Sequence, residues 1–433
     1  MTPASTIGQQ TKKQLKEAIL AHRPRIEEWF AEQARLAPPP FYCSIDLRDS
    51  GYKIAPVDSN LYPAGFNNIC PEDMRTAPPL VRKQIEAGIA RAGLTCPNGQ
   101  TCPKRILILP EAHTSNQYYA ENLYYLNQLV SEAGFETRIG WYPEAEGPVH
   151  LTSATGKEFD AYPIRITEGV LSADGFVPDL ILLNNDFSGG YPERLDSVKQ
   201  PILPSHRLGW HSRKKSEHFR HYNALAGEFA TIIGVDPWLL QVDTEEVTPV
   251  NFNEDVGIRE TESVVGRMLE RIRAAYERHK VNRKPFVFVK NNAGTYGMGI
   301  MTVHDANELE HLNRRAKNKM SVGKGKMAIE SVVVQEGIPT ATIVDRLAAE
   351  PVIYLFGSEL IGGFLRTNTE RGDEDNLNSQ GMAFRKLCMS DLRSEDDEPH
   401  EIPTMELVYG SIARISALAA GRELAERQQN AGR

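Results

Sequence analysis

The segment that decides the fold is PFVFVKNNAGTYGMGIMTV, residues 285–303. An apolar run ends at Lys290, as expected of a buried strand, and Gly294, Gly297 and Gly299 follow in the next turn. Glycine lets backbone N–H groups approach a phosphate closely, and a lysine at the end of a strand offsets phosphate charge. The segment therefore predicts a nucleotide clamp, with Lys290 on the phosphates beneath a glycine-rich loop.

The same segment excludes two common nucleotide-binding turns. No Gly-Lys-Ser/Thr sequence ends the glycine run, so it is not a Walker loop, and no helical pattern follows Gly299, so it is not a Rossmann turn. Residues 300–303 instead predict a second strand that pairs with the first. A glycine-rich hairpin without a ligand is the alternative, because short glycine patterns occur widely.

Three motifs downstream supply context: VVVQEGI (332–338), EPVIYLFGSELIGGFLRTN (350–368) and DNLNSQGM (375–382). Together with the clamp, their order resembles the ATP-grasp superfamily over residues 215–382. The resemblance implies ATP and Mg²⁺ as cofactors and Arg366 and Lys290 as the catalytic residues. It further implies a set of nucleotide contacts, from Lys215, Lys290, Gly294, Gly297, Gly299, Gln335, Glu336 and Ile338.

The metal ligands depart from the pattern of that superfamily, which usually carries Glu-x-Asn near the end of the motif series. This chain has Asn376-Leu377-Asn378, so Asn378 matches while Asn376 replaces a carboxylate. Mg²⁺ prefers anionic oxygen ligands, so the missing charge must come from elsewhere. We expect Asn376, Asn378 and Glu350 at the metal, with the acidic loop Asp373-Glu374-Asp375 as another source of carboxylates or simply a solvated loop.

At the level of the whole chain the resemblance becomes narrower. The runs SIDLRDSGYKIAPVDSNLYPAGFNN (44–68), LLNNDFSGG (182–190) and GWHSRKKSEHF (209–219) resemble the proteobacterial-type glutamate-cysteine ligase family. This resemblance implies ATP-dependent ligation of the γ-carboxyl group of glutamate to cysteine through an acyl phosphate, the first step of glutathione biosynthesis. Glutamate, cysteine and ATP are then the expected small-molecule partners.

Residues able to bind amino-acid substrates occur in two places. A zwitterionic substrate needs cations for its carboxylates and Asp or Asn for its ammonium group. The first segment provides Arg48, Lys53, Asp58, Asn60, Asn67 and Asn68, and the end of a predicted strand provides Asn184, Asn185 and Asp186. The alternative is turn formation, which the same residue types favour.

Hydrophobic spacing predicts an α/β (α+β) protein. Residues 11–36 predict a helix kinked near Pro24, and residues 42–70 an irregular surface segment. Strands at 105–110, 135–141 and 180–183 around a helix at 117–133 indicate a Rossmann-like unit. Further strands at 331–335, 352–356 and 359–366 precede a helix at 405–425. We expect a helical and substrate-binding segment (1–100), a Rossmann-like pre-ATP-grasp domain (101–210) and an ATP-grasp domain (211–433).

Composition excludes several classes of function. The net charge of −8 is not concentrated in a basic stripe, so nucleic acid is not an expected partner. No apolar stretch is long enough to cross a bilayer, and the first residues lack the pattern of a signal peptide. We therefore expect a cytoplasmic protein that does not bind a membrane. The five cysteines lack metal-site spacing and are expected to be reduced thiols. The sequence leaves open whether the chain forms a homo-oligomer.

Phosphoryl chemistry of this kind needs charge neutralisation and positioning rather than a protein nucleophile. We therefore predict no nucleophile and assign no base among His206, His211 and His218. Three alternatives stay open on the sequence: another ATP-grasp amide ligase such as glutathione synthetase, a non-catalytic nucleotide-binding protein, and a small-molecule kinase.

Overall fold

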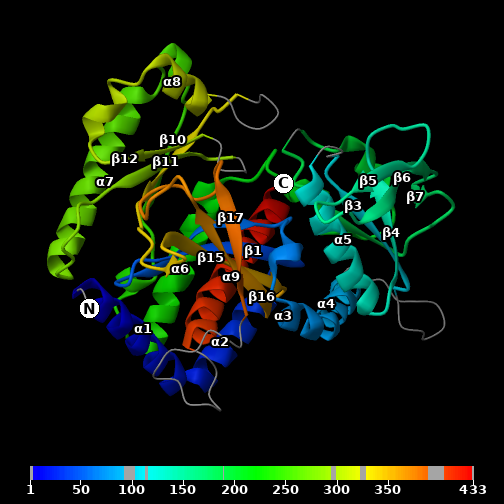
Figure 1. Cartoon of the computed structure of the whole chain (residues 1–433), viewed down its shortest axis with the longest axis horizontal. Coiled ribbons are helices and arrows are strands. Elements are labelled where there is room, and N and C mark those ends of the chain that lie inside the picture. The colour runs from blue at the N-terminus through cyan, green and yellow to red at the C-terminus, as the bar shows by residue number, and fades with distance from the viewer. Residues whose placement is uncertain are drawn as a thin grey trace.

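The computed structural model describes residues 3–91, 103–112, 116–188, 190–293, 299–321, 328–388 and 404–431. These residues form a mixed α/β structure with three sheets (Figure 1). The sheet that carries β10 to β12 lies with helices α7 and α8 on one side of the view, and the sheet that carries β3 to β7 lies on the other. The remaining sheet lies between them, together with the C-terminal helix α9 (Thr404–Ala431).

The N-terminal helical prediction is confirmed with one difference. The helix is two helices, α1 (Pro3–Ala21) and α2 (Arg23–Leu36), separated at His22. Pro24 lies in the first turn of α2, where its missing N–H would have had no intrahelical partner. The proline therefore starts the second helix rather than kinking a single one.

The central sheet has the order β17-β16-β15-β1-β2, with β14 beside β15. Its ladders are antiparallel throughout. The strands are β1 (Tyr42–Asp49), β2 (Ile54–Asn60), β14 (Ile343–Val344), β15 (Leu347–Phe356), β16 (Glu359–Asn368) and β17 (Met382–Leu387). Helix α9 packs against β1, β2 and β15 and against helices α1 and α6 (Lys215–Ile233).

The prediction of an irregular surface segment at residues 42–70 is wrong. The segment contains β1, buried at every residue, and β2, and it ends in a 3-10 turn (Phe66–Asn68) before helix α3 (Pro71–Thr76). Its polar residues misled the prediction because they pair inside the protein: Asp46 and Arg48 are 4% and 3% exposed. The polar composition reflects a buried charged network rather than solvent.

The second sheet has the order β10-β13-β11-β12 and carries the predicted clamp. Strand β11 (Val287–Asn291) pairs antiparallel with β12 (Ile300–Val303), which confirms the hairpin. Strands β10 (Thr244–Val247) and β13 (Val332–Glu336) complete the sheet. One stripe of helix α7 (Ile258–Arg278), including Val265 and Met268, is buried in the same core, and α8 (Arg314–Ser321) lies nearby.

The third sheet has the order β5-β6-β4-β3-β8-β9, with β7 beside β6. Strands β4, β3, β8 and β9 are parallel, as the Rossmann-like pattern predicted. The strands are β3 (Arg105–Pro110), β4 (Glu136–Trp141), β5 (Val149–Thr152), β6 (Glu158–Thr167), β7 (Val170–Ala173), β8 (Leu180–Asn184) and β9 (Ile202–Leu203). Helices α4 (Pro78–Arg91) and α5 (Gln117–Glu132) pack together against this region.

The pairing of β1 with β15 joins the two ends of the chain in one sheet. Residues of the predicted N-terminal segment and of the predicted ATP-grasp domain therefore share a sheet and a core. The division into ranges 1–100, 101–210 and 211–433 stays a prediction. None of the helices among the described residues is long and apolar enough to cross a membrane.

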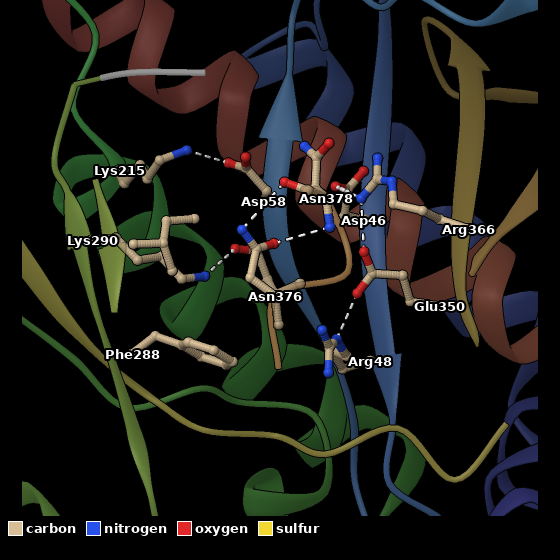
Figure 2. A pocket seen from close by; sticks show the side chains of 12 residues that line it. Asp46, Arg48, Asp58, Lys215, Phe288, Lys290, Glu350, Arg366, Asn376 and Asn378 are labelled. Atoms are coloured by element: carbon tan, nitrogen blue, oxygen red, sulfur yellow. Dashed lines mark hydrogen bonds and ion pairs between the residues drawn. The ribbon is translucent and has the colours of Figure 1, made fainter. Parts of the chain in front are cut away.

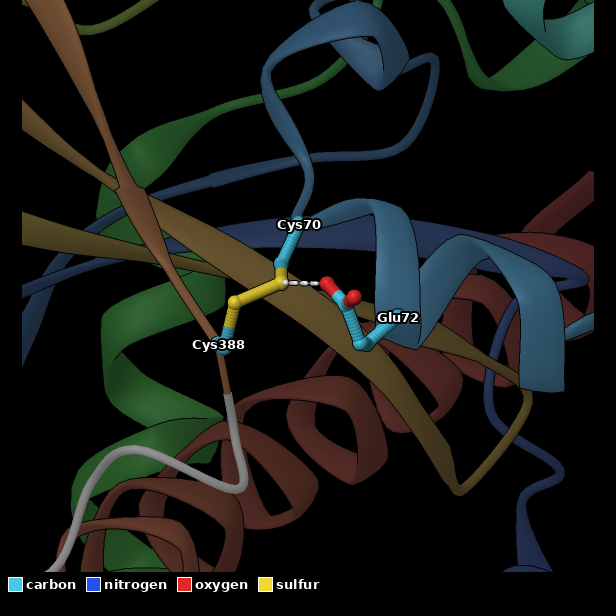
Figure 3. Close-up of side chains that lie close together, drawn as sticks. All are labelled: Cys70, Glu72 and Cys388. Atoms are coloured by element: carbon cyan, nitrogen blue, oxygen red, sulfur yellow. Dashed lines mark hydrogen bonds between the residues drawn. A yellow bond between two sulfur atoms is a disulfide. The ribbon is translucent and has the colours of Figure 1, made fainter.

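The prediction of reduced cysteines is wrong for Cys70 and Cys388, which form a disulfide (Figure 3). Cys70 precedes α3, which packs against β16, and Cys388 follows β17, so the central sheet brings together residues 318 apart in sequence. No local pattern signals such a contact. Cys43 is free and buried, whereas Cys96 and Cys102 lie outside the described residues.

Candidate active site

A small cavity of about 40 Å³ lies between the central and second sheets (Figure 2). Most of the residues that the sequence analysis placed at phosphate and metal meet here, although they come from separate strands and loops. The side chains around it belong to Asp46, Arg48, Val57, Asp58, Lys215, Phe288, Lys290, Ile300, Glu350, Arg366, Asn376 and Asn378. The structure thus brings Lys215, Lys290 and Arg366 together around one cavity.

Two lysines are held on one side of this cavity. Lys290 lies one residue before the end of β11 and donates from Nζ to Gln335 Oε1 at 2.6 Å and to the Val57 carbonyl at 3.2 Å. Burial lowers the pKa of Lys290 to about 7, although Asp58 opposes the shift. Lys215 begins α6 and donates to Asp58 Oδ1 at 2.5 Å. Both ammonium groups are therefore placed before any ligand binds.

Arg366 lies on the other side, on β16. Its Nη1 donates to Asp46 Oδ2 and to Glu350 Oε1, each at 2.7 Å. Burial opposes the charge, but Asp46 and Glu350 outweigh it and raise the pKa of Arg366. Arg366 and Glu350 are direct partners across the β15–β16 ladder, which fixes their distance.

Glu350 lies between two arginines. Besides Arg366, Arg48 donates from Nε to Glu350 Oε2 at 2.6 Å. Although burial acts in the opposite direction, Arg48 and Arg366 lower the pKa of Glu350, so it stays ionised. Each oxygen already accepts a strong charge-assisted bond, which makes Glu350 a poorer metal ligand than its position in the sequence indicated.

The sequence analysis gave Asp46 no role and expected Asp58 to bind substrate. They face each other across the β1–β2 ladder and both line the small cavity. Asp46 Oδ1 is buried and accepts no hydrogen bond from the described residues. Burial raises the pKa of Asp46 despite Arg366, and Glu350 and Asp58 add to the rise. Burying the charged form of Asp46 therefore costs free energy, and a cation beside these carboxylates would offset that cost.

One signal in the sequence could have identified this pair. The carboxylate-x-Asn spacing that was sought at residues 376–378 is present at Asp58-Ser59-Asn60, in β2. The sequence analysis assigned Asp58 and Asn60 to substrate because Asp and Asn suit the ammonium group of an amino acid, and that assignment stays a prediction. Asp46 had no role because nothing local marks it as opposite Asp58.

A second cavity, of about 420 Å³, adjoins the first, and Arg366 and Asn378 line both. Asn60, Asn67 and Asn68 line it, as does Asp186 from the loop after β8. Among its described lining residues, Glu111, Glu121 and Asp186 are acidic and only Arg366 is a permanent cation. The cavity therefore favours ligands that carry ammonium groups.

Three predicted substrate residues line neither cavity. Lys53 is buried and donates to both oxygens of Glu336, at 2.6 and 2.7 Å. Asn184 donates to Tyr42 Oη at 3.1 Å and to the Pro63 carbonyl at 2.7 Å. Asn185 donates to the Pro110 carbonyl at 3.2 Å. Their polar groups are occupied within the protein, so these contacts fasten strands and loops to one another.

The acidic loop is held by its backbone. Arg48 donates to the carbonyls of Asp373 at 2.9 Å and Asp375 at 2.6 Å. The Asp373 carboxylate instead pairs with Arg283 at 2.8 Å near the surface, and Glu374 lies 3.6 Å from the same arginine. These carboxylates are not among the side chains that line either cavity in the described part of the chain.

The predicted nucleotide loop and adenine residues are only partly described. Gly294 and Gly297 lie outside the described residues, and Gly299 follows them with a φ of +63°. Gln335 and Glu336 end β13 beside Lys290 and Lys53, and Ile338 is buried. His206, His211 and His218, to which the sequence analysis assigned no role, are not among the described residues that line either cavity.

Comparison with known proteins gives the family of the chain. The family model for glutamate-cysteine ligase matches residues 16–424. A solved structure from Methylobacillus flagellatus KT, named a "Putative gamma-glutamylcysteine synthetase", is 37% identical, with a TM-score of 0.85 and coverage of 95% of this chain and 96% of that one. A search of curated proteins returned no match.

Two more distant structures are ligases of another kind. D-alanyl-alanine synthetase A from Vibrio cholerae is 13% identical, with a TM-score of 0.35 over 73% of this chain and 81% of that one. D-cycloserine synthetase DcsG is 12% identical, with a TM-score of 0.37 over 74% and 82%. The match of the family model over nearly the whole chain decides the assignment, and the chain belongs to the glutamate-cysteine ligase family.

Proposed function

We propose that this ligase joins the γ-carboxyl group of glutamate to the amine of cysteine where its two cavities meet. The observation that carries the proposal is that Arg366 and Asn378 line both cavities. The small cavity has lysines and carboxylates suited to ATP phosphates and a metal, and the larger one has room for amino acids. ATP phosphorylates the γ-carboxyl group, and the amine of cysteine then displaces phosphate from the acyl phosphate.

The nucleotide in this proposal lies against the second sheet, in the manner of an ATP-grasp enzyme. Lys215 and Lys290 bind its phosphates as point charges. Their ammonium groups are already held by Asp58 and Gln335, so little reorganisation is needed when ATP arrives. Gln335, Glu336 and Ile338 remain the proposed adenine contacts.

The residues present fit a magnesium ion. Asp46 has a buried oxygen without a partner in the described chain, and Asp58 faces it across the ladder. We assign the metal to Asp46 and Asp58, with Asn60 completing the carboxylate-x-Asn spacing and with Asn376 and Asn378, which line the same cavity (Figure 2), beside them. Mg²⁺ takes few ligands from protein, and when bound it neutralises charge on the phosphates.

Arg366 acts at the junction. Its guanidinium group is fixed by Asp46 and Glu350, so it can meet the negative charge that develops on the transferred phosphoryl group without rearranging. Glu111 and Asp186, on the far wall of the larger cavity, are suited to the ammonium groups of the two amino acids. Positioning rather than covalent catalysis accounts for the reaction.

The test is orthophosphate release by the purified protein with Mg²⁺ and ATP, with glutamate and cysteine supplied separately and together. We expect release only with both amino acids, and a γ-linked dipeptide identified by mass. Release that instead requires γ-glutamylcysteine and glycine would replace the proposal with glutathione synthetase, and no release under any condition would leave only nucleotide binding.

A further inference from the structure

Behind the site, a buried cluster of Arg213, His218 and Glu423 joins α6 and α9 to β2. Arg213 donates from Nε to Glu423 Oε1 at 2.9 Å, from Nη2 to His218 Nδ1 at 3.2 Å and from Nη1 to the Ser59 carbonyl at 2.5 Å. Arg213, His218 and Glu423 are 2%, 2% and 1% exposed. None of these three side chains lines either cavity.

The charges in this cluster are fully paired. Although burial alone would raise it, Arg213 and His218 lower the pKa of Glu423 to about 2. Burial lowers the pKa of His218, so its Nδ1 accepts from Arg213 and its Nε2 donates to Ser416 Oγ at 3.1 Å. The buried ion pair with Glu423, together with the bonds to His218 and Ser59, holds the Arg213 guanidinium in one orientation.

The bond from Arg213 reaches the backbone of β2 at Ser59, between Asp58 and Asn60. In the described part of the chain, β2 is an edge strand of the central sheet and pairs with β1 alone. Its ladder with β1 shifts register between Asp46 and Leu47, beside Asp58. The ladder sets Asp58 opposite Asp46 and Asn60 opposite Ser44, and the bond from Arg213 adds a second hold on the Ser59 backbone between them.

The short segment 213–215 fastens β2 from two directions. Arg213 holds the Ser59 backbone, while Lys215 holds the Asp58 side chain at 2.5 Å. The ring centre of Trp210 lies 4.9 Å from the Arg213 guanidinium and 4.4 Å from the Lys215 ammonium, so one aromatic ring contacts both cations.

We infer that Arg213 is a positioning residue, which orients Asp58 and Asn60 toward the metal from behind the site without touching substrate. The inference rests on the proposed function, because it takes Asp58 as a metal ligand. Supporting contacts of this kind typically change metal affinity by about 10-fold to 100-fold when removed.

The test variant is Arg213→Lys, which keeps a charge opposite Glu423 but has no fork able to reach Glu423 and Ser59 together. The matched control is Arg427→Lys, since Arg427 lies 3.9 Å from Glu423 and also binds Glu217, but not Ser59. Asp58→Asn reports on the metal ligand itself. Binding of Mn²⁺ is measured by electron paramagnetic resonance with a non-hydrolysable ATP analogue, and unfolding temperature is measured beside it.

We expect Arg213→Lys to weaken Mn²⁺ binding by at least about 10-fold while Arg427→Lys binds like the wild type and the unfolding temperatures agree. Wild-type Mn²⁺ binding in Arg213→Lys, together with weakened binding in Asp58→Asn, overturns the positioning role alone. Wild-type binding in Asp58→Asn overturns the proposed metal site instead. If Arg213→Lys does not fold, the double variant Arg213→Met/Glu423→Gln, which leaves no unpaired buried charge, carries the same comparison.

Discussion

Single residues of this site are charged groups whose partners are already in place. Lys290 is held by Gln335, and Arg366 is held by Asp46 and Glu350. Burial makes each unpaired charge costly, so these contacts both stabilise the fold around the site and fix the positions of the groups that meet substrate. Because the pKa of Lys290 is about 7, its protonation changes near neutral pH and can be followed when a ligand binds.

Binding of ATP should take up protons above neutral pH. Burial lowers the pKa of Lys290 to about 7, so the amine is mostly neutral at about pH 8. A bound phosphate favours the charged form and raises this pKa, so up to about one proton enters with the nucleotide, and affinity falls by at most about tenfold per pH unit above neutrality.

Calorimetry of a non-hydrolysable ATP analogue, in two buffers of different ionisation enthalpy, measures this uptake. Lys290→Met should abolish it, while Lys214→Met, which removes an exposed lysine paired with Glu246, should leave it unchanged. Equal binding heats for the wild type in both buffers would contradict the expectation.

Arg366→Lys should lower kcat by about 100-fold or more, because a lysine cannot reproduce the planar fork that meets the transferred phosphoryl group. The retained charge keeps Asp46 and Glu350 paired, so the unfolding temperature should change little. Steady-state kinetics measures the effect. Arg385→Lys, on β17 and bonded to Asp345 at the surface, is the control, and equal rates in the two variants would refute the role of Arg366.

Among the elements, the β1–β2 hairpin matters most to the site. It was predicted as an irregular segment, yet it supplies Asp46, Arg48 and Asp58 to the small cavity. Because β1 pairs with β15, the N-terminal part of the chain completes a site whose other residues come from α6, β11, β12, β15, β16 and the segment before β17.

Two isosteric variants separate the metal assignments. Asp46→Asn should raise the Mg²⁺ concentration that gives half-maximal activity by about tenfold or more, since it removes an anionic ligand. Glu350→Gln should raise it much less, because both Glu350 oxygens already bind arginines. Titration of activity with Mg²⁺ checks both, and the reverse order would return the metal to Glu350.

The disulfide between Cys70 and Cys388 joins α3 to the end of β17. Closing a long loop stabilises a fold mainly by restricting the unfolded chain, by about 2–4 kcal/mol. Denaturant unfolding should therefore show this loss in the Cys70→Ser/Cys388→Ser double variant and in the reduced wild type. A double variant that still responds to reductant, or a wild type that does not, would count against the bond.

On the scale of the whole molecule, the local elements could be predicted and the long-range pairings could not. The strands at β3, β8 and β11 and the helix α5 follow from apolar runs and helical spacing. Arg48 and Glu350, by contrast, are 302 residues apart in sequence and meet only because β1 inserts beside β15. Because charged residues such as Arg48 are buried in β1, the sequence of this core strand resembles that of a surface loop.

The site followed the same division. Lys290 and Arg366 could be placed from their motifs, because each motif ends a strand that faces the cavity. Asn184 resembled a ligand-binding residue for the same reason, yet Tyr42 and Pro63 occupy its amide. Whether a polar residue is free to bind substrate depends on neighbours that only the tertiary structure supplies.

The central claim is that the N-terminal hairpin holds the metal where the two cavities meet. Anomalous X-ray diffraction from crystals soaked with Mn²⁺, a non-hydrolysable ATP analogue and glutamate locates that metal directly. We expect a Mn²⁺ peak bound by Asp46 and Asp58, with Arg366 and the γ-carboxyl group of glutamate on opposite sides of the ion. A peak coordinated by Glu350 or by residues 376–378 without the hairpin carboxylates would contradict it.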